Sequence, residues 1–138
     1  MTFAESLATY LQNHAGLIAL VNSRIHPVRA PDSVLADADS YVTFSLRIEP
    51  ENQLNECGID LATITAIAYA RPSATRSGYG RAHEIAQELR NALAFFRGQL
   101  ALNGYVSQGS QVISSEDSDS ADAGVSEVTT TAEMFYCP

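Results

Sequence analysis

The sequence is short of the residues on which several common functions depend. It has two cysteines and only eight Lys and Arg residues against sixteen Asp and Glu, which gives a formal net charge of −8 over 138 residues. Proteins that coat nucleic acid hold phosphates with clustered Lys and Arg, so this balance excludes a general coating role. Cys57 and Cys137 lack the CxxC or Cys/His spacing of a zinc site and make no disulfide framework. We expect two buried or idle thiols.

Long apolar runs and a basic N-terminal segment are also missing. No stretch approaches the roughly 18 apolar residues that a membrane span needs, and no secretory signal opens the chain. We therefore expect a protein that stays in the cytoplasm where it is made and has no membrane partner. What the sequence does contain is 46% hydrophobic residues, which at this length predicts a single domain, residues 1–138, with an ordinary core.

The N-terminal part shows the spacing of helices. Apolar residues recur at helical intervals on either side of Gly16: Phe3, Leu7, Tyr10 and Leu11 before it, and Leu17, Leu20 and Val21 after it. Glycine favours a break, so we predict two linked helices. Residues 25–28 can form only a short edge strand, because Pro27 lacks the N–H that a central strand must donate.

Alternation of apolar and polar residues predicts the strands. Residues 41–48 alternate cleanly and indicate a half-buried strand, and residues 61–70 indicate a second one with small side chains on its even positions. Small side chains allow a helix to approach closely. Residues 105–114 and 125–137 predict two more strands, the latter with Val128, Met134 and Tyr136 on one side.

The long helix is predicted by one apolar stripe. Its members follow the spacing of a core-facing surface: Ala82, Ile85, Ala86, Leu89, Ala92, Leu93 and Phe96. Gly98 is a plausible stop signal. The order of elements predicts an α+β fold, a mainly antiparallel four-stranded sheet with the long helix and the N-terminal helices packed on one face.

Candidates for chemistry are weak. His26 lies near three aspartates in sequence and could be drawn as a general base or a metal ligand, but no spacing fixes these residues on one face: Asp32, Asp37 and Asp39. Gly78 and Gly80 precede a helix, yet they lack the other residues of a nucleotide-binding loop. We expect no catalytic, cofactor-binding or metal-binding residue, and no enzyme activity.

The acidic run EDSDSAD, residues 116–122, has an alternative explanation as a calcium loop. Ala121 stands where a third ligand would fall, and the required Gly and terminal Glu are misplaced. A solvated loop is the simpler interpretation of this run.

Three segments carry a resemblance to a known family. AGLIALVNSRIHPVRAP (15–31), YVTFSL (41–46) and ELRNALAFFRGQL (88–100) resemble the tail completion proteins, or tail terminators, of long-tailed, siphovirus-like bacteriophages. The likeness spans nearly the whole chain. It departs from the family's pattern at Asn22 and Ser23, which replace common glycines, and at Ser40, which replaces a frequent proline.

The resemblance implies a structural virion protein of the tail neck, assembled in the host cytoplasm. It implies a homo-oligomeric ring, typically a hexamer, that caps the head-proximal end of the tail tube, ends tube polymerisation and meets the head–tail connector or stopper protein. Genomic DNA would pass through the ring without specific binding. The remaining alternatives are a small dimeric α+β ligand-binding module and, behind it, a hydrolase that uses His26 and the nearby aspartates.

Two sets of surface residues follow from this hypothesis. Proline-stiffened backbone holds basic side chains at the edge of the fold, which suits an interface that also includes the arginines near residue 75: Arg24, His26, Arg29, Arg71 and Arg76. Carboxylates repel phosphates, so the acidic run is expected at the lumen or its rim: Glu116, Asp117, Asp119 and Asp122.

Overall fold

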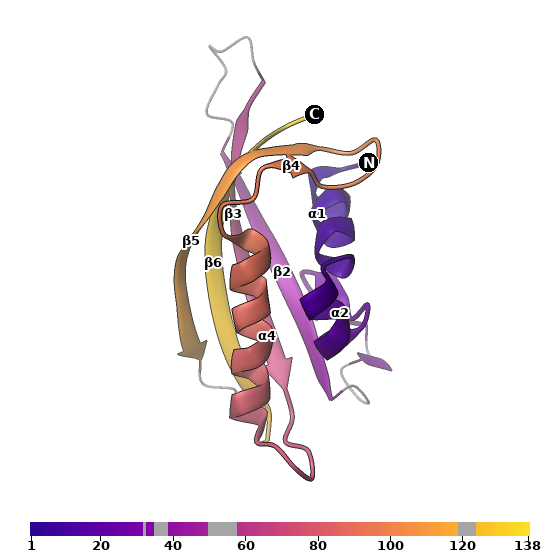
Figure 1. Cartoon of the computed structure of the whole chain (residues 1–138), viewed down its shortest axis with the longest axis vertical. Helices are drawn as coiled ribbons and strands as arrows, with labels where there is room; N and C mark the ends of the chain where they lie inside the picture. The colour runs from indigo at the N-terminus through magenta and orange to yellow at the C-terminus, as the bar shows by residue number, and fades with distance from the viewer. Residues whose placement is uncertain (32, 35–38, 50–57, 119–123) are drawn as a thin grey trace.

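The fold is a curved sheet with helices on its concave side. A computed structural model of the chain describes residues 1–31, 33–34, 39–49, 58–118 and 124–138. Six strands form one sheet in the order β1-β2-β3-β6-β5-β4, and the three helices of the described residues lie on the same side of it (Figure 1). In this part of the chain no helix is long and apolar enough to span a bilayer.

The prediction of a mainly antiparallel four-stranded sheet is wrong. The strands are β1 (Ile25–Pro27), β2 (Ser40–Glu49), β3 (Asp60–Ala70), β4 (Gly98–Gln99), β5 (Val106–Ser118) and β6 (Ser126–Cys137). β1 adds to one edge and runs parallel to β2, whereas all other pairs are antiparallel, so the sheet is mixed. β4 adds to the opposite edge. Pro27 is tolerated because β1 is the edge strand there.

The N-terminal helices are α1 (Phe3–Gln12) and α2 (Ala15–Val21). α1 begins in a capping box, in which the Thr2 hydroxyl accepts the Glu5 N–H at 3.1 Å and the Glu5 carboxylate accepts the Thr2 N–H at 2.7 Å. The break between the helices falls before Ala15 and not at Gly16 as predicted. A Cβ at Gly16 would meet the Glu88 side chain of the long helix, and the flexible carboxylate end of that side chain would have to move.

The long helix α4 (Gly78–Leu93) covers β3 and β6. Ser77 caps it, accepting the Gly80 N–H at 3.1 Å. Its buried stripe is the predicted one except at the C-terminal end, where the helix stops at Leu93 rather than near Gly98. On β3 the helix meets the small side chains that the sequence indicated: Ala62, Ala66, Ala68 and Ala70, all buried.

The opposite side of the sheet carries no helix in the described residues. Its side chains are the intervening strand positions, and many are threonines: Thr43, Thr63, Thr65, Thr129 and Thr131, with Arg47, Glu116 and Glu133 among the charged ones. We call this surface the open face.

Candidate functional site

Two edges of the sheet are incompletely paired within the described residues. β1 pairs only with residues 42–44 of β2, which leaves residues 45–49 at one edge. β4 pairs only with Val106 and Ser107, which leaves residues 111–118 of β5 at the other. Unpaired strand edges offer N–H and C=O groups to another chain. Such edges are therefore the first candidates for an assembly surface.

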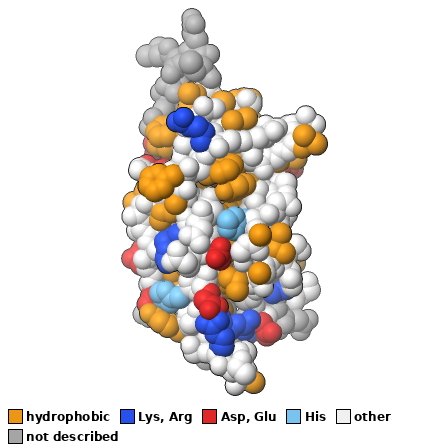
Figure 2. Space-filling view, viewed as in Figure 1, with side chains coloured by type: hydrophobic (Ala, Val, Ile, Leu, Met, Phe, Trp, Pro, Cys, Tyr) orange, Lys and Arg blue, Asp and Glu red, His pale blue; other side chains and the backbone are white. Residues whose placement is uncertain are grey.

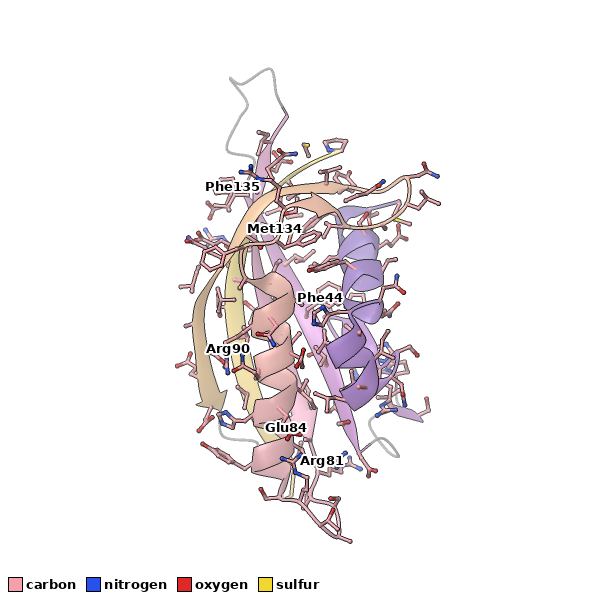
Figure 3. All side chains as sticks on the ribbon, in the orientation of Figure 1. Phe44, Arg81, Glu84, Arg90, Met134 and Phe135 are labelled. Carbon is pink, nitrogen blue, oxygen red and sulfur yellow. The ribbon has the colours of Figure 1, made fainter. Side chains whose placement is uncertain are left out.

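A hollow lies beside the β5 edge, near the upper end of the sheet where Figure 3 labels Phe135. It has a volume of about 230 Å³ and is lined by Phe95, Gly109, Ser110, Gln111, Glu133 and Phe135. Phe95 is 86% exposed and Phe135 is 41% exposed. Gly109 pairs with Phe135 across the two strands and has no side chain to fill the space between the rings. We call this site the β5 hollow.

Phe95 is exposed because the turn after α4 holds it outward. Its φ of 55° is left-handed, which is rare for a bulky residue and costs conformational energy. Its N–H donates to the Ser110 carbonyl at 2.9 Å. The Ser110 hydroxyl accepts the Phe96 N–H at 2.9 Å and donates to the Leu93 carbonyl at 2.6 Å. The turn is thus fastened to β5, and an aromatic ring is presented to solvent in a fixed position.

The predicted basic edge around β1 is partly structural. Arg24 donates from Nε to the Ser40 carbonyl at 2.7 Å, and the Ser40 hydroxyl donates to the Leu20 carbonyl at 3.1 Å, so this arginine joins the end of α2 to the start of β2. Burial lowers the pKa of His26, and none of the described residues gives its Nε2 a hydrogen bond. Val28 follows with a φ of 64° and is 78% exposed.

The other predicted interface arginines lie apart from one another. Arg29 is exposed just after β1. The Arg71 carbonyl accepts Nη1 of Arg81 at 2.8 Å, and Arg76 forms an ion pair with Glu84. Figure 3 places Arg81 and Glu84 together at the lower end of α4, and Figure 2 shows basic and acidic side chains intermixed there.

A groove of about 190 Å³ lies between this end of α4 and the start of β2, where Arg24 binds Ser40. Arg76, Arg81 and Glu84 line it together with Ser40, the residue that binds Arg24. A wider hollow of about 350 Å³ continues between α2 and α4 beside Glu88. His14 contacts the Glu88 carboxylate at 3.3 Å there. This surface is a mosaic of paired charges and not one basic patch.

The acidic run does not begin as a loop. Glu116 and Asp117 belong to β5, and alternation sends their side chains to opposite sides of the sheet. Glu116 lies on the open face. Asp117 faces α4, where it contacts His83 Nε2 at 2.6 Å and accepts the Tyr79 hydroxyl at 3.1 Å. Asp119 and Asp122 lie outside the described residues.

No group of three or more His, Cys, Asp or Glu residues that could hold a metal ion occurs in the described part of the chain. Asp32, Asp37 and Cys57, which bear on the catalytic, metal and thiol predictions, lie outside it. Cys137 is half-buried and accepts a weak hydrogen bond from Gln108 Nε2 at 3.0 Å.

The incomplete edges and the β5 hollow could not be found from the sequence. The hollow combines residues from a turn and two strands, and only the strand register brings them together. The one local signal was the pair Phe95 and Phe96, of which a helical stripe needs only the second.

Comparison with known proteins gives one informative likeness. No protein-family model matches the chain, and no curated protein does. Among solved structures, a chain described as "Virion of native gene transfer agent (GTA) particle" superposes with a TM-score of 0.66 and 13% sequence identity, over 97% of this chain and 93% of that one. At this identity the likeness concerns the fold: the protein is similar, over nearly its whole length, to a chain of a virion particle.

Proposed function

We propose that this protein is a structural component of a phage-like virion. The observation that carries the proposal is the fold likeness to a chain of a gene transfer agent virion, which spans nearly the full length of both chains. An architecture alone does not determine a function. The independent sequence resemblance to phage tail completion proteins points in the same direction.

Within the virion, we assign the protein to the neck of the tail as a tail terminator. It would form a ring on the head-proximal end of the tube, stop tube polymerisation and join the tail to the head–tail connector. Two incompletely paired edges on opposite sides of one sheet support such a ring, because a contact between unlike surfaces repeats around a closed circle. Six subunits are proposed from the family resemblance.

DNA would pass through this ring without sticking to it. The chain carries a net charge of −8, and Glu116 is exposed on the open face beside a row of threonines. These hydroxyls and carboxylates offer phosphates none of the cations whose binding releases counterions, and Arg47 lies at the edge of this face. We therefore place Glu116, and the acidic segment that follows it, at the lumen or its rim.

A non-catalytic role fits the described cavities. The β5 hollow and the groove beside Arg76 have volumes of about 230 and 190 Å³, below the roughly 300–1,000 Å³ of typical small-molecule sites, and the hollow of about 350 Å³ between α2 and α4 lies at the small end of that range. The His26 ring lies at the sheet edge without a described partner for Nε2.

The test uses the purified chain and the tail tube protein of the same virion. Native mass spectrometry should find a closed oligomer of six copies, and negative-stain images should show a ring at one end of each tube. Adding the protein during tube assembly should give shorter tubes, in proportion to its amount. Tubes of unchanged length with bare ends would contradict the proposal.

A further inference from the structure

One row of the open face joins the two incomplete edges. The strand register aligns Arg47 of β2 with Thr63 of β3, Thr63 with Glu133 of β6, and Glu133 with Gln111 of β5. Arg47 therefore lies at one edge of the sheet and the β5 hollow at the other, at the same position along the strands. Three strand spacings, about 14 Å, separate the two ends of the row.

The β5 hollow has the chemistry of a guanidinium site. Two phenylalanine rings, Phe95 and Phe135, flank it, and the Glu133 carboxylate lines it. Gln111 donates to that carboxylate at 3.3 Å and leaves it other lone pairs to offer. Arginine is the side chain that both stacks on aromatic rings and pairs with a carboxylate. The volume of the hollow corresponds to roughly eight waters, enough for the end of one side chain.

Arg47 is available to another molecule. Its side chain is 79% exposed and contacts the neighbouring Glu49 at 3.2 Å, a pair of little strength at the surface. Ile48, the next residue along this edge, is 46% exposed and would be covered by a partner. The edge thus offers a cation and an apolar side chain, and the hollow offers an anion and two rings.

We propose that Arg47 of one copy of this chain occupies the β5 hollow of the next copy. The contact joins the free edge of β2 to the free edge of β5, which run in opposite senses, so the two sheets meet as antiparallel neighbours. Donor and acceptor surfaces lie at opposite edges of the sheet and in the same row, so each copy uses both, and a contact that repeats without a shift along the strands closes as a ring when the rotation between copies divides the circle. This inference rests on the proposed ring and identifies the surfaces that build it.

Charge reversal tests the contact directly. Arg47→Glu and Glu133→Arg should each weaken self-association at least about tenfold, measured by sedimentation and native mass spectrometry over a concentration series. The double variant restores opposite charges and should recover most of that loss. Ala74→Glu with Thr75→Glu gives the same net charge as Arg47→Glu, in an exposed turn far from the row, and should associate as the wild type does.

A second pair of variants tests the aromatic wall without altering charge. Phe95→Ala should weaken association by about tenfold, since it removes the ring that stacks on the guanidinium. Leu102→Ala is the matched control, because Leu102 is 81% exposed and lies outside the row. Equal association of the wild type, Phe95→Ala and both charge reversals would overturn the inference, as would a wild type that never self-associates, alone or on tubes.

Cross-linking separates this inference from the proposed function. In a chain with Cys57 and Cys137 replaced by serine, Arg47→Cys and Gln111→Cys should oxidise into a ladder of covalent oligomers. A ladder that closes at a number other than six would leave the inference intact and refute the hexamer. Rings that cap tubes but give no ladder would leave the proposed function intact and refute the contact.

Discussion

Replacing Ser110 with alanine should loosen the turn that presents Phe95. The Ser110 side chain is almost fully buried and makes two hydrogen bonds, from the Phe96 N–H at 2.9 Å and to the Leu93 carbonyl at 2.6 Å. Alanine would fit the space without strain but leave both backbone groups without this partner. A buried group left unsatisfied costs about 1–3 kcal/mol.

Two such groups, one of which can reach solvent after relaxation, give an expected loss of about 2–4 kcal/mol in the free energy of unfolding. With a urea m-value near 2 kcal/mol/M, the midpoint should fall by about 1–2 M at unchanged slope. Hydrogen exchange at the amides of Phe95 and Phe96 should accelerate more than exchange in the middle of α4. The loosened turn should also weaken self-association, because the ring wall is no longer held in place.

Ser114→Ala is the matched control for this change. Ser114 lies on the same strand but is exposed. Its hydroxyl contacts water, and removing that contact leaves no buried group without a partner. It should change the free energy of unfolding by less than about 0.5 kcal/mol. A Ser110→Ala variant as stable as Ser114→Ala would refute the role given to this hydroxyl.

Three further substitutions test separate parts of the fold. Leu89→Ala should lower the free energy of unfolding by about 3–5 kcal/mol in a denaturant titration, since Leu89 is fully buried and the small alanines of β3 cannot fill the cavity. The control Asn91→Ala, at an exposed position of the same helix, should change it little. A loss under about 0.5 kcal/mol for Leu89→Ala would place α4 outside the core. Asp117→Ala should cost no more than about 1 kcal/mol globally but speed amide exchange at the end of β5, because its contacts to α4 are exposed; unchanged exchange would show that they do not hold the strand. Burial lowers the pKa of His26 below its ordinary 6.5, so the unfolded chain binds more protons between the two pKa values, and stability falls as the pH drops below about 6.5. His26→Gln should reduce this loss of stability, measured by urea titrations at pH 7.5 and 5.5. An identical loss in both proteins would exclude the histidine as its source.

The sequence predicted those parts of the fold in which apolar residues recur at the regular spacing of a strand or a helix. Alternation located β2, β3 and β6, and the stripe located the buried face of α4, because an apolar period repeats along each of them. In β2 the burial departs from that period, since residues 40–44 are buried on both faces and Ile48, predicted on the buried face, is 46% exposed. β4 has two residues and no measurable period. β1 was placed correctly at an edge, but its direction depends on the path of the chain back to β2, which no local pattern encodes.

The acidic end of β5 was missed for a different reason. Ser115, Glu116, Asp117 and Ser118 have poor strand propensity, yet each pairs with a residue of β6, and the hydrogen bonds of the ladder override the local preference. Gly16 was misinterpreted in the opposite way. It lies inside α2, where the flexible side chain of Glu88, more than seventy residues away in sequence, occupies the space beside it.

The candidate site required information that one sequence does not hold. Arg47 and Glu133 are 86 positions apart and become one row only through the registers of β2 with β3 and of β3 with β6. A slip of one residue in either pairing would send one of the two side chains to the helix side of the sheet. Arg24 stood out in the sequence because of the nearby prolines. In the structure it fastens α2 to β2, and its role at an interface stays a prediction.

The placement of Glu116 can be tested by giving the ring a charge that DNA would bind. Glu116 is exposed on the open face, so Glu116→Arg should fold normally and put one cation per subunit wherever that face lies. The wild-type ring, built from chains of net charge −8, should not retain duplex DNA. The variant ring should, and six phosphate contacts predict that affinity falls about a thousandfold between 50 and 200 mM salt.

Binding alone does not say whether the new cations lie inside the ring or outside it, but the topology of the DNA does. A closed ring can thread onto linear duplex and cannot thread onto a covalently closed circle. Cations at the lumen should therefore retain linear duplex but not covalently closed circles that are offered to preformed rings. Equal retention of linear and circular duplexes of the same length would place Glu116 on the outer wall and exclude a channel lined by the open face.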